Sequence, residues 1–302
     1  MFQEREHCEC LFYQSVKEKI INSSIGRFFD EENRIREMIE NSREGMVMSE
    51  FILECCVDSV ESALAAAEGG ADRLELCSAL VIGGISPGLA LFEQVSACCD
   101  LPVRVLLRPR FGDFLYTDYE FQILKREVAL FREAGAEGVV IGCLDADGSL
   151  HMAQMRELIA EAGDMKVTLH RAFDVCADPV ETYKKAGELG IDTILTSGQK
   201  KECLMGMPLL KELSRMQKEA GMPRIMAGAG VTPDVIRQFC EQTDITSYHL
   251  SAKKVLDSGM LYRKEDVPMG LPVMDEYSIF MTDSSVVAEA KKVLVEHMSV
   301  LP

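Results

Sequence analysis

Residues 51–77 carry the sequence FILECCVDSVESALAAAEGGADRLELC, and the order of residue types in this stretch predicts a strand, a helix and a second strand. The run 51–57 is short and mostly apolar, as expected of a buried strand. Residues 60–68 are rich in alanine and glutamate, which favour a helix, and Gly69-Gly70 suit the left-handed turn that often ends one. A strand–helix–strand unit of this length is typical of a parallel sheet.

The same unit recurs along the rest of the chain. Short apolar runs lie at 51–57, 73–77, 103–109, 138–144, 166–174, 193–198, 224–230 and 247–252. Helical patterns lie at 60–68, 89–98, 118–134, 152–162, 179–189, 208–220, 233–242 and, after a longer connection through 269–282, at 284–297. Eight successive units over about 250 residues match a closed TIM (β/α)8 barrel better than an open doubly wound sheet.

Residues 1–47 do not follow this alternation of strands and helices. They are rich in charge, and amphipathic stretches near 16–25 and 32–39 predict an N-terminal helical extension that is loosely ordered. We therefore divide the chain into an extension at 1–47 and a barrel domain at 48–302. Because residues 43–45 can be encoded by the purine-rich codons of a ribosome-binding site, a native start at Met46 or Met48 is the alternative.

Composition narrows the function classes. The 302 residues carry a net charge of −17, which disfavours nucleic acid and an anionic membrane surface as partners, since both attract basic proteins. No apolar run approaches the roughly 20 residues that span a bilayer, and the charged start lacks the apolar region of a signal peptide. Eleven cysteines, with no paired Cys-x-x-Cys arrangement for zinc, predict reduced thiols in a cytoplasmic protein.

The carboxyl ends of the predicted strands should carry the chemistry, because the active sites of TIM barrels lie there. Polar or glycine residues occupy most of these ends. They are Glu54 and Cys56, Glu75 and Cys77, Arg108 and Arg110, His170 and Asp174, Ser197, Gly228 and Gly230, and His249 and Ser251. The members of each pair are an even number of residues apart, so in an extended strand they face the same side. We expect all of them to converge on one mouth.

The two arginines suit a carboxylate or a phosphate, because a guanidinium group binds such anions with two parallel hydrogen bonds. In this hypothesis Arg108 and Arg110 hold a small anionic substrate, and Glu54 or Glu75 supplies a catalytic carboxylate. The alternative is a structural network in which these four residues pair with one another inside the barrel.

His170 and Asp174 predict a general acid/base pair or a pair of metal ligands. A core histidine whose hydrogen bonds are satisfied, with no part in chemistry, is the alternative. The sequence alone does not decide between these interpretations.

The late strands offer a further anion site. Gly228 and Gly230 with Ser197 are suited to surround a phosphate, as loops at this position do in many barrels, and His249 and Ser251 lie nearby on the last strand. Tight turns without a ligand explain the glycines equally well.

Cys56 and Cys77 raise the question of a metal. Soft thiolates favour Cu(I), and two of them suffice for a linear site. Two small side chains that fill a layer of the barrel are the alternative. The neighbouring Glu54 and Glu75 suit a harder divalent ion, such as Mg²⁺, Mn²⁺ or Zn²⁺.

Taken together, these residues resemble the CutC family, which is named for copper homeostasis. The matching stretches follow one another in order through 50–270 and include Cys56-Val57-Asp58-Ser59, Glu75-Leu76-Cys77, Arg108-Pro109-Arg110, His170-Arg171-Ala172-Phe173-Asp174, Leu195-Thr196-Ser197-Gly198-Gln199 and Gly228-Ala229-Gly230-Val231. The resemblance implies a cytoplasmic TIM barrel that forms homo-oligomers and binds copper ion. It places the family's proposed Cu(I) thiols at Cys56 and Cys77.

Two functional hypotheses follow, and a third, a purely structural or regulatory oligomer, is less favoured because it leaves the polar strand ends unexplained. One is a copper-binding homeostasis protein without turnover, and the other is a barrel enzyme that acts on a small anionic ligand. Cu(I) binding does not need the arginines and histidines, whereas a pocket for an anion does. The residues by themselves therefore favour the enzyme, and the family resemblance favours copper.

Overall fold

The computed structural model describes residues 51–219, 221–264, 267, 269 and 275–299. The predicted helical extension at 1–47, and with it the alternative start at Met46 or Met48, lies outside the described residues.

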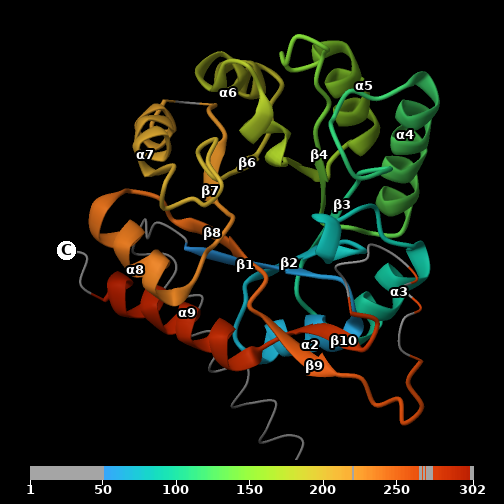
Figure 1. Ribbon diagram of the computed structural model, residues 1–302. Helices are drawn as coiled ribbons and strands as arrows, with labels where there is room; N and C mark the ends of the chain where they lie inside the picture. The colour runs from blue at the N-terminus through green and yellow to red at the C-terminus, as the bar shows by residue number, and fades with distance from the viewer. Residues whose placement is uncertain (1–50, 220, 265–266, 268, 270–274, 300–302) are drawn as a thin grey trace, which may run out of the picture. The chain divides into compact units, whose positions relative to one another are not determined.

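Eight parallel strands close into a barrel in which each strand pairs with the next along the chain and the last pairs with the first (Figure 1). They are β1 (Ile52–Val57), β2 (Arg73–Leu76), β3 (Val103–Leu106), β4 (Gly138–Ile141), β5 (Lys166–Leu169), β6 (Thr193–Thr196), β7 (Arg224–Ala227) and β8 (Ser247–Leu250). The predicted TIM barrel is confirmed.

Helices surround the barrel and separate the strands. They are α2 (Val60–Glu68), α3 (Leu89–Cys98), α4 (Asp118–Glu133), α5 (Met152–Ala162), α6 (Pro179–Glu188), α7 (Met207–Met216), α8 (Pro233–Gln242) and α9 (Ser284–Met298). Their starts agree closely with the sequence because polar caps define them: Ser59 accepts the N–H of Ser62, and Thr117 and Glu120 form a capping box. No described helix combines the length and the apolar character needed to cross a membrane.

The larger apolar core lies between strands and helices, whereas the barrel interior combines buried charges with a small apolar cluster of Cys77, Leu106 and Val140. On β1, Leu53, Cys55 and Val57 pack into the core that the helices cover, so Glu54 and Cys56 face the interior. Glu54 is completely buried, and its Oε2 lies 2.5 Å from Nε of Arg73, its partner in the β1–β2 register. Charge pairing inside a barrel compensates the cost of burying both groups.

A second buried arginine completes this interior. Nε of Arg104 on β3 lies 2.8 Å from Glu137, and its Nη1 lies 2.9 Å from Asp192 and donates to the hydroxyl of Thr168. The predicted network of Glu54 and Glu75 with Arg108 and Arg110 is therefore not the one that forms. Arg73 and Arg104 supply the interior positive charge instead.

The strands end earlier than predicted. Strand β3 stops at Leu106, and β5 stops at Leu169, where a short 3₁₀ helix, η2 (Arg171–Val175), follows. The prediction that 166–174 form one strand was wrong, and so was the inference that His170 and Asp174 share a strand face.

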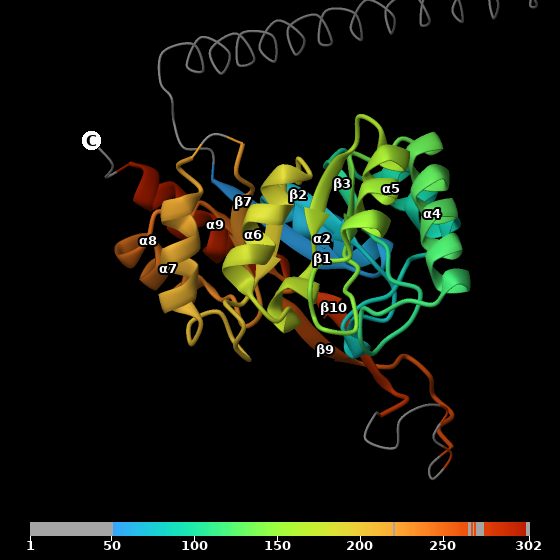
Figure 2. The same ribbon diagram turned by 90° about the horizontal axis from the view of Figure 1, so that it is seen from above.

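An antiparallel hairpin joins β8 to α9. It consists of β9 (Lys253–Asp257) and β10 (Ser278–Thr282), and Figure 2 shows it at the edge of the barrel. The N–H of Thr282 donates to Oγ of Ser62, which joins β10 to α2. The sequence predicted only a connection here. A further 3₁₀ turn, η1 (Leu80–Ile82), follows β2.

Candidate functional site

A cavity of about 370 Å³ opens at the carboxyl ends of the strands. Polar side chains from five strand ends or the loops after them line it, namely Cys56, Glu75, Arg108, His170, Arg171, Asp174 and His249. The cavity gathers only part of the set that was expected to converge there. Arg110, Ser197, Gly228, Gly230, Ser251 and Cys77 are not among its lining residues.

Arg108 enters this cavity from the loop after β3. Its Nη1 donates to the carbonyl of Gly84 at 3.3 Å, its Nη2 donates to the carbonyl of Gly112 at 2.6 Å, and the guanidinium carbon lies 5.0 Å from the centre of the Phe114 ring. Burial lowers the pKa of Arg108. The buried Nε has no hydrogen-bond partner among the described residues, so the side chain is held in place with one donor free.

Arg110 turns away from the mouth. Its Nε lies 2.6 Å from Glu120, and its Nη2 lies 2.9 Å from Oδ1 of Asp113 and donates to the carbonyl of Leu115. The structure does not bring Arg110 beside Arg108, because both residues follow the end of β3 and strand alternation no longer applies. Arg110 holds its own loop against α4.

His170 is a neutral hydrogen-bond donor. Its Nδ1 accepts the N–H of Ala172 at 3.1 Å, so the ring proton resides on Nε2. Burial, followed by the charge of Arg108, lowers the pKa of His170 to about 3. Its Nε2 is buried and finds no partner in the described part of the chain. The ring packs on Phe114 with 4.7 Å between centroids, and Gly142 leaves room for it.

Asp174 is fully engaged by the loop after β6. Its carboxylate accepts the N–H groups of Ser197 and Gln199 at 3.0 and 3.2 Å, and the hydroxyl of Thr196 at 2.6 Å. Nε of Arg171 lies 2.6 Å away. The backbone groups predicted to surround a phosphate at Ser197 thus surround the chain's own carboxylate. Asp174 orders this loop, and the structure does not pair it with His170.

The remaining predicted residues lie elsewhere. Gly228 donates its N–H to the carbonyl of Thr196 at 3.0 Å, and a Cβ there would lie 2.4 Å from Cδ1 of Leu195. Gly228 is thus a close-packed position between β6 and β7. Gly230 and Ser251 line a second cavity next to the mouth.

Glu54, His249 and Glu75 form a linked group on β1, β8 and β2. Nδ1 of His249 lies 2.8 Å from Oε1 of Glu54 and 3.9 Å from Oε2 of Glu75. Burial raises the pKa of Glu54, but Arg73 and His249 outweigh burial and bring it to about 2. Burial lowers the pKa of His249, yet Cys56, Glu75 and Glu54 hold it well above its ordinary value. The raised pKa favours the protonated form of His249 between these two carboxyl groups.

Glu75 differs from Glu54 although both are buried. Burial raises the pKa of Glu75 to about 7, because it lacks a close ion pair of the kind that Glu54 forms with Arg73. Its Oε2 is buried without a hydrogen-bond partner in the described ranges. A carboxyl group with a pKa near neutrality and a free oxygen is suited to accept or deliver a proton.

The same three residues are the one group in the described chain whose ligand atoms meet closely enough for a metal ion. One atom from each of Glu54, Glu75 and His249 lies within 4.8 Å of the other two, and two oxygens with one nitrogen suit a divalent ion. Both oxygens of Glu54 are already engaged, however, by Arg73 and His249. The geometry fits a protonated histidine at this position better than a metal.

The two candidate copper thiols have different surroundings. Cys56 faces the cavity and contacts the carbonyl of Leu250, with 3.6 Å between sulfur and oxygen. Cys77 is completely buried with Leu106 and Val140, and burial raises the pKa of its thiol. Because Cu(I) binds thiolates, and the cavity reaches one of the two sulfurs, these residues fit copper poorly as they stand.

Sequence reasoning missed two arginines at the site. Arg73 lies two residues before Glu75, so strand alternation by itself places it on the interior face. Arg171 lines the mouth directly after His170, but its orientation depends on η2, which no sequence pattern indicated.

Comparison with known proteins gives consistent results. Residues 51–254 match the sequence model of the CutC family. The chain is 41% identical over 249 residues to a CutC family protein of Citrobacter koseri, which covers 82% of this chain and 99% of that protein. It is 38% identical over 244 residues to one of Histophilus somni, with 81% and 99% covered. The solved structure of CutC from Streptococcus agalactiae superposes with a TM-score of 0.63 and 23% identity, covering 67% of this chain and 98% of that one.

Proposed function

The chain belongs to the CutC family. From the geometry of its site we propose that it is an enzyme that binds a small organic anion, a carboxylate or a phosphate, and transfers a proton on it. The ligand binds at the mouth of the barrel. This proposal rests on the site and not on the family name.

One observation carries the proposal. Nε of Arg108, Nε2 of His170 and Oε2 of Glu75 are buried, lack hydrogen-bond partners within the described ranges, and belong to residues that line one cavity. An unpaired buried polar group costs about 1–3 kcal/mol. Three of them around one cavity are best explained by a ligand that supplies the missing hydrogen bonds.

The chemistry of each group suggests its role. Arg108 binds the negative charge of the ligand, and Nε2–H of His170 donates to an oxygen on which negative charge develops. Glu75 accepts a proton from the carbon next to a carbonyl, and the C–H electron pair moves toward the oxygen that His170 stabilises. Glu75 then returns the proton to the same carbon, which exchanges it with solvent. When that carbon bears a hydroxyl group whose proton moves to the former carbonyl oxygen, Glu75 instead delivers the proton to the former carbonyl carbon, and the net reaction is an isomerisation.

Ligand binding tests the anion site. In thermal-shift and calorimetric titrations with inorganic phosphate, small 2-oxo acids and sugar phosphates, we expect at least one of these anions to stabilise the wild type. Arg108→Ala should abolish that stabilisation, and Arg110→Ala should retain it, because Arg110 bonds to its own loop. Equal loss in both variants, or no stabilisation by any anion, would contradict the proposal.

Isotope exchange tests the proton transfer. The wild type in D₂O should incorporate deuterium next to the carbonyl of the ligand that binds, as followed by NMR. Glu75→Gln should bind the same ligand without exchange. Undiminished exchange in this variant would exclude Glu75 as the base.

Cu(I) binding at Cys56 and Cys77 is the second candidate. In its favour, the two thiols come from adjacent strands, and Cys56 is paired in register with Glu75, two residues before Cys77. Titration of Cu(I) against a competing chelator should then give a lower affinity for Cys56→Ser/Cys77→Ser than for the wild type. The exposed Cys98 provides the control variant Cys98→Ser, and affinity that is the same in all three proteins would remove this candidate.

We further propose that the protein acts in the cytoplasm and self-associates. The nine cysteines in the described ranges are free thiols, which supports a reducing compartment. Cell fractionation and light scattering after gel filtration test the two statements separately.

A further inference from the structure

A second cavity, of about 410 Å³, adjoins the mouth. Cys56, Leu80, Arg171 and His249 line both cavities, so the two spaces meet at these four side chains. Each volume by itself lies near the lower end of the range for small-molecule sites. Together they suit a ligand longer than one that fills the mouth alone.

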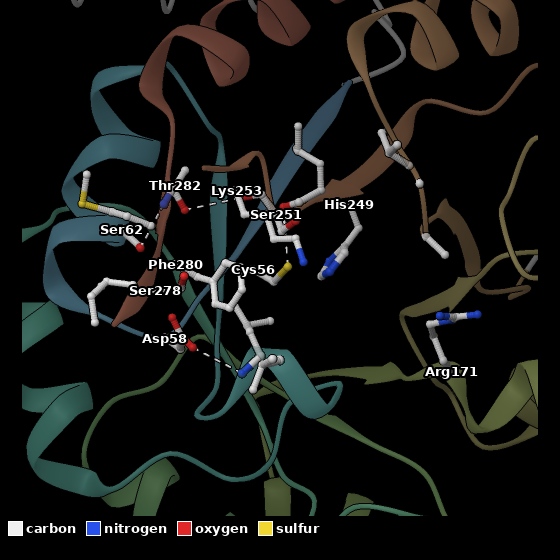
Figure 3. A pocket seen from close by; sticks show the side chains of 18 residues that line it. Cys56, Asp58, Ser62, Arg171, His249, Ser251, Lys253, Ser278, Phe280 and Thr282 are labelled. Atoms are coloured by element: carbon white, nitrogen blue, oxygen red, sulfur yellow. Dashed lines mark hydrogen bonds between the residues drawn. The ribbon is translucent and has the colours of Figure 1, made fainter. Parts of the chain in front are cut away.

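The second cavity has a mixed lining. Leu80, Ile279 and Phe280 give it an apolar side, and Ser251 and Lys253 add polar groups (Figure 3). Most of these residues come from the β9–β10 hairpin or from the end of β8 just before it. The hairpin therefore supplies one wall of the space beside the reactive groups.

Lys253 is the distinctive charge in this cavity. Its Nζ lies 5.0 Å from the centre of the Phe280 ring, and no described carboxylate pairs with it. The adjacent Lys254, in contrast, lies 3.6 Å from Asp283. The free ammonium group is notable in a chain whose net charge is −17.

One acidic residue also lines the cavity. Oδ2 of Asp58 accepts the N–H of Leu80 at 3.2 Å, so this carboxylate is already bonded within the chain. In Figure 3, Asp58 lies beyond the Phe280 ring from Lys253. The Lys253 end of the cavity is therefore the end suited to a negative group.

We propose that the ligand is an elongated dianion. Its first negative group binds at Arg108 and His170, its middle packs against Leu80 and Phe280, and its second negative group pairs with Lys253. This inference rests on the proposed function and names the substrate class of the same site.

Matched pairs of aliphatic acids test it in calorimetric titrations of the full chain. The pairs are butyrate with succinate, hexanoate with adipate, and octanoate with suberate. We expect the longer dicarboxylates to bind severalfold more tightly than the monocarboxylates of equal length. A gain of this size is what one partly exposed ion pair, here between the second carboxylate and Lys253, contributes to binding. Lys253→Ala should remove this preference, and Lys254→Ala should keep it.

The possible outcomes separate the two proposals. If Lys253→Ala keeps the preference for dicarboxylates, or if the wild type shows none, while Arg108→Ala abolishes binding, the elongated dianion is wrong and the anion site stands. If neither series binds to the wild type while inorganic phosphate, a 2-oxo acid or a sugar phosphate does, the elongated dianion is wrong and the anion site stands. If none of these anions binds, both proposals are overturned. Because Lys253 is exposed, its substitution leaves the fold intact, which circular dichroism can verify.

Discussion

Nδ1 of His249 donates a hydrogen bond to Oε1 of Glu54 across 2.8 Å, and this contact joins the last strand of the barrel to the first. The other oxygen of Glu54 lies 2.5 Å from Arg73 on β2. One buried carboxylate thus links three consecutive strands at the point where the barrel closes. Its negative charge faces the guanidinium group of Arg73 on one side and, on the other, His249, whose pKa is raised.

Loss of this carboxylate should destabilise the protein strongly. In Glu54→Gln, Arg73 remains buried without a counter-charge, and breaking a buried pair in this way costs about 3–5 kcal/mol. Urea unfolding measures the change. Asp244→Asn, which breaks the exposed pair with Lys218, is the control and should change the unfolding free energy by less than about 1 kcal/mol. Similar costs in both variants would contradict the role of Glu54.

Glu75 should make stability depend on pH. Its pKa in the folded chain is about 7, above its ordinary value of 4.5, so the folded state favours the protonated form. The corresponding stabilisation is complete below pH 4.5 and is lost as the pH rises through 7, with a slope of at most about 1.4 kcal/mol per pH unit. The unfolding free energy of the wild type should fall relative to Glu75→Gln over this window. A constant difference between pH 4.5 and 7 would contradict the raised pKa.

Asp174→Asn should lower stability even though the substitution is nearly isosteric. The new amide directs N–H groups toward donors of the loop after β6, among them the N–H of Ser197, and a hydrogen bond to a charged group contributes about 1.5–3 kcal/mol. Asp178→Asn is the matched control, because Asp178 caps α6 and asparagine caps nearly as well. Thermal unfolding compares the two variants. Unchanged stability in Asp174→Asn, combined with lost proton exchange, would restore the predicted acid/base role of Asp174.

Gly142→Ala should disturb the position of His170. A Cβ at residue 142 would lie 2.7 Å from Nδ1 and Cε1 of the imidazole and 2.9 Å from Cδ1 of Leu169. We expect a cost of about 1–3 kcal/mol from overpacking, together with weaker anion binding. Gly259→Ala, where a Cβ meets nothing within 4 Å, should change neither property. Full anion affinity in Gly142→Ala would show that the position of His170 does not matter.

Much of the fold could be predicted from sequence because its signals are local. Apolar runs, helix caps such as Ser59 and Thr117, and the glycines after the helices define the eight units without reference to the rest of the chain. The hairpin was missed for the same reason. Strands β9 and β10 are separated by about twenty residues, and their pairing depends on contacts that no local pattern reports.

The site was predictable only as far as the strands extend. Glu54, Glu75, Cys56 and His249 lie on strands or at their ends, and the mouth brings Cys56, Glu75 and His249 together beside Glu54. Beyond the strands, side-chain direction depends on loop geometry.

Arg110 and Asp174 show this limit. Both follow the end of a strand, and each is bound by its own neighbourhood instead of facing the cavity as a free group. The residue types pointed to an anion, but the partners of each residue required the structure.

The alternation on β1 has a consequence for how the barrel assembles. Shifting this strand by one residue against its neighbours would place Glu54 in the apolar core beneath the helices. It would also bring Leu53 or Cys55 opposite Arg73. In each such register Arg73 and Glu54 are buried without the ion pair that they form in the native barrel. The charged interior therefore penalises wrong alignments, and it favours a single register of β1 with β2 and β8.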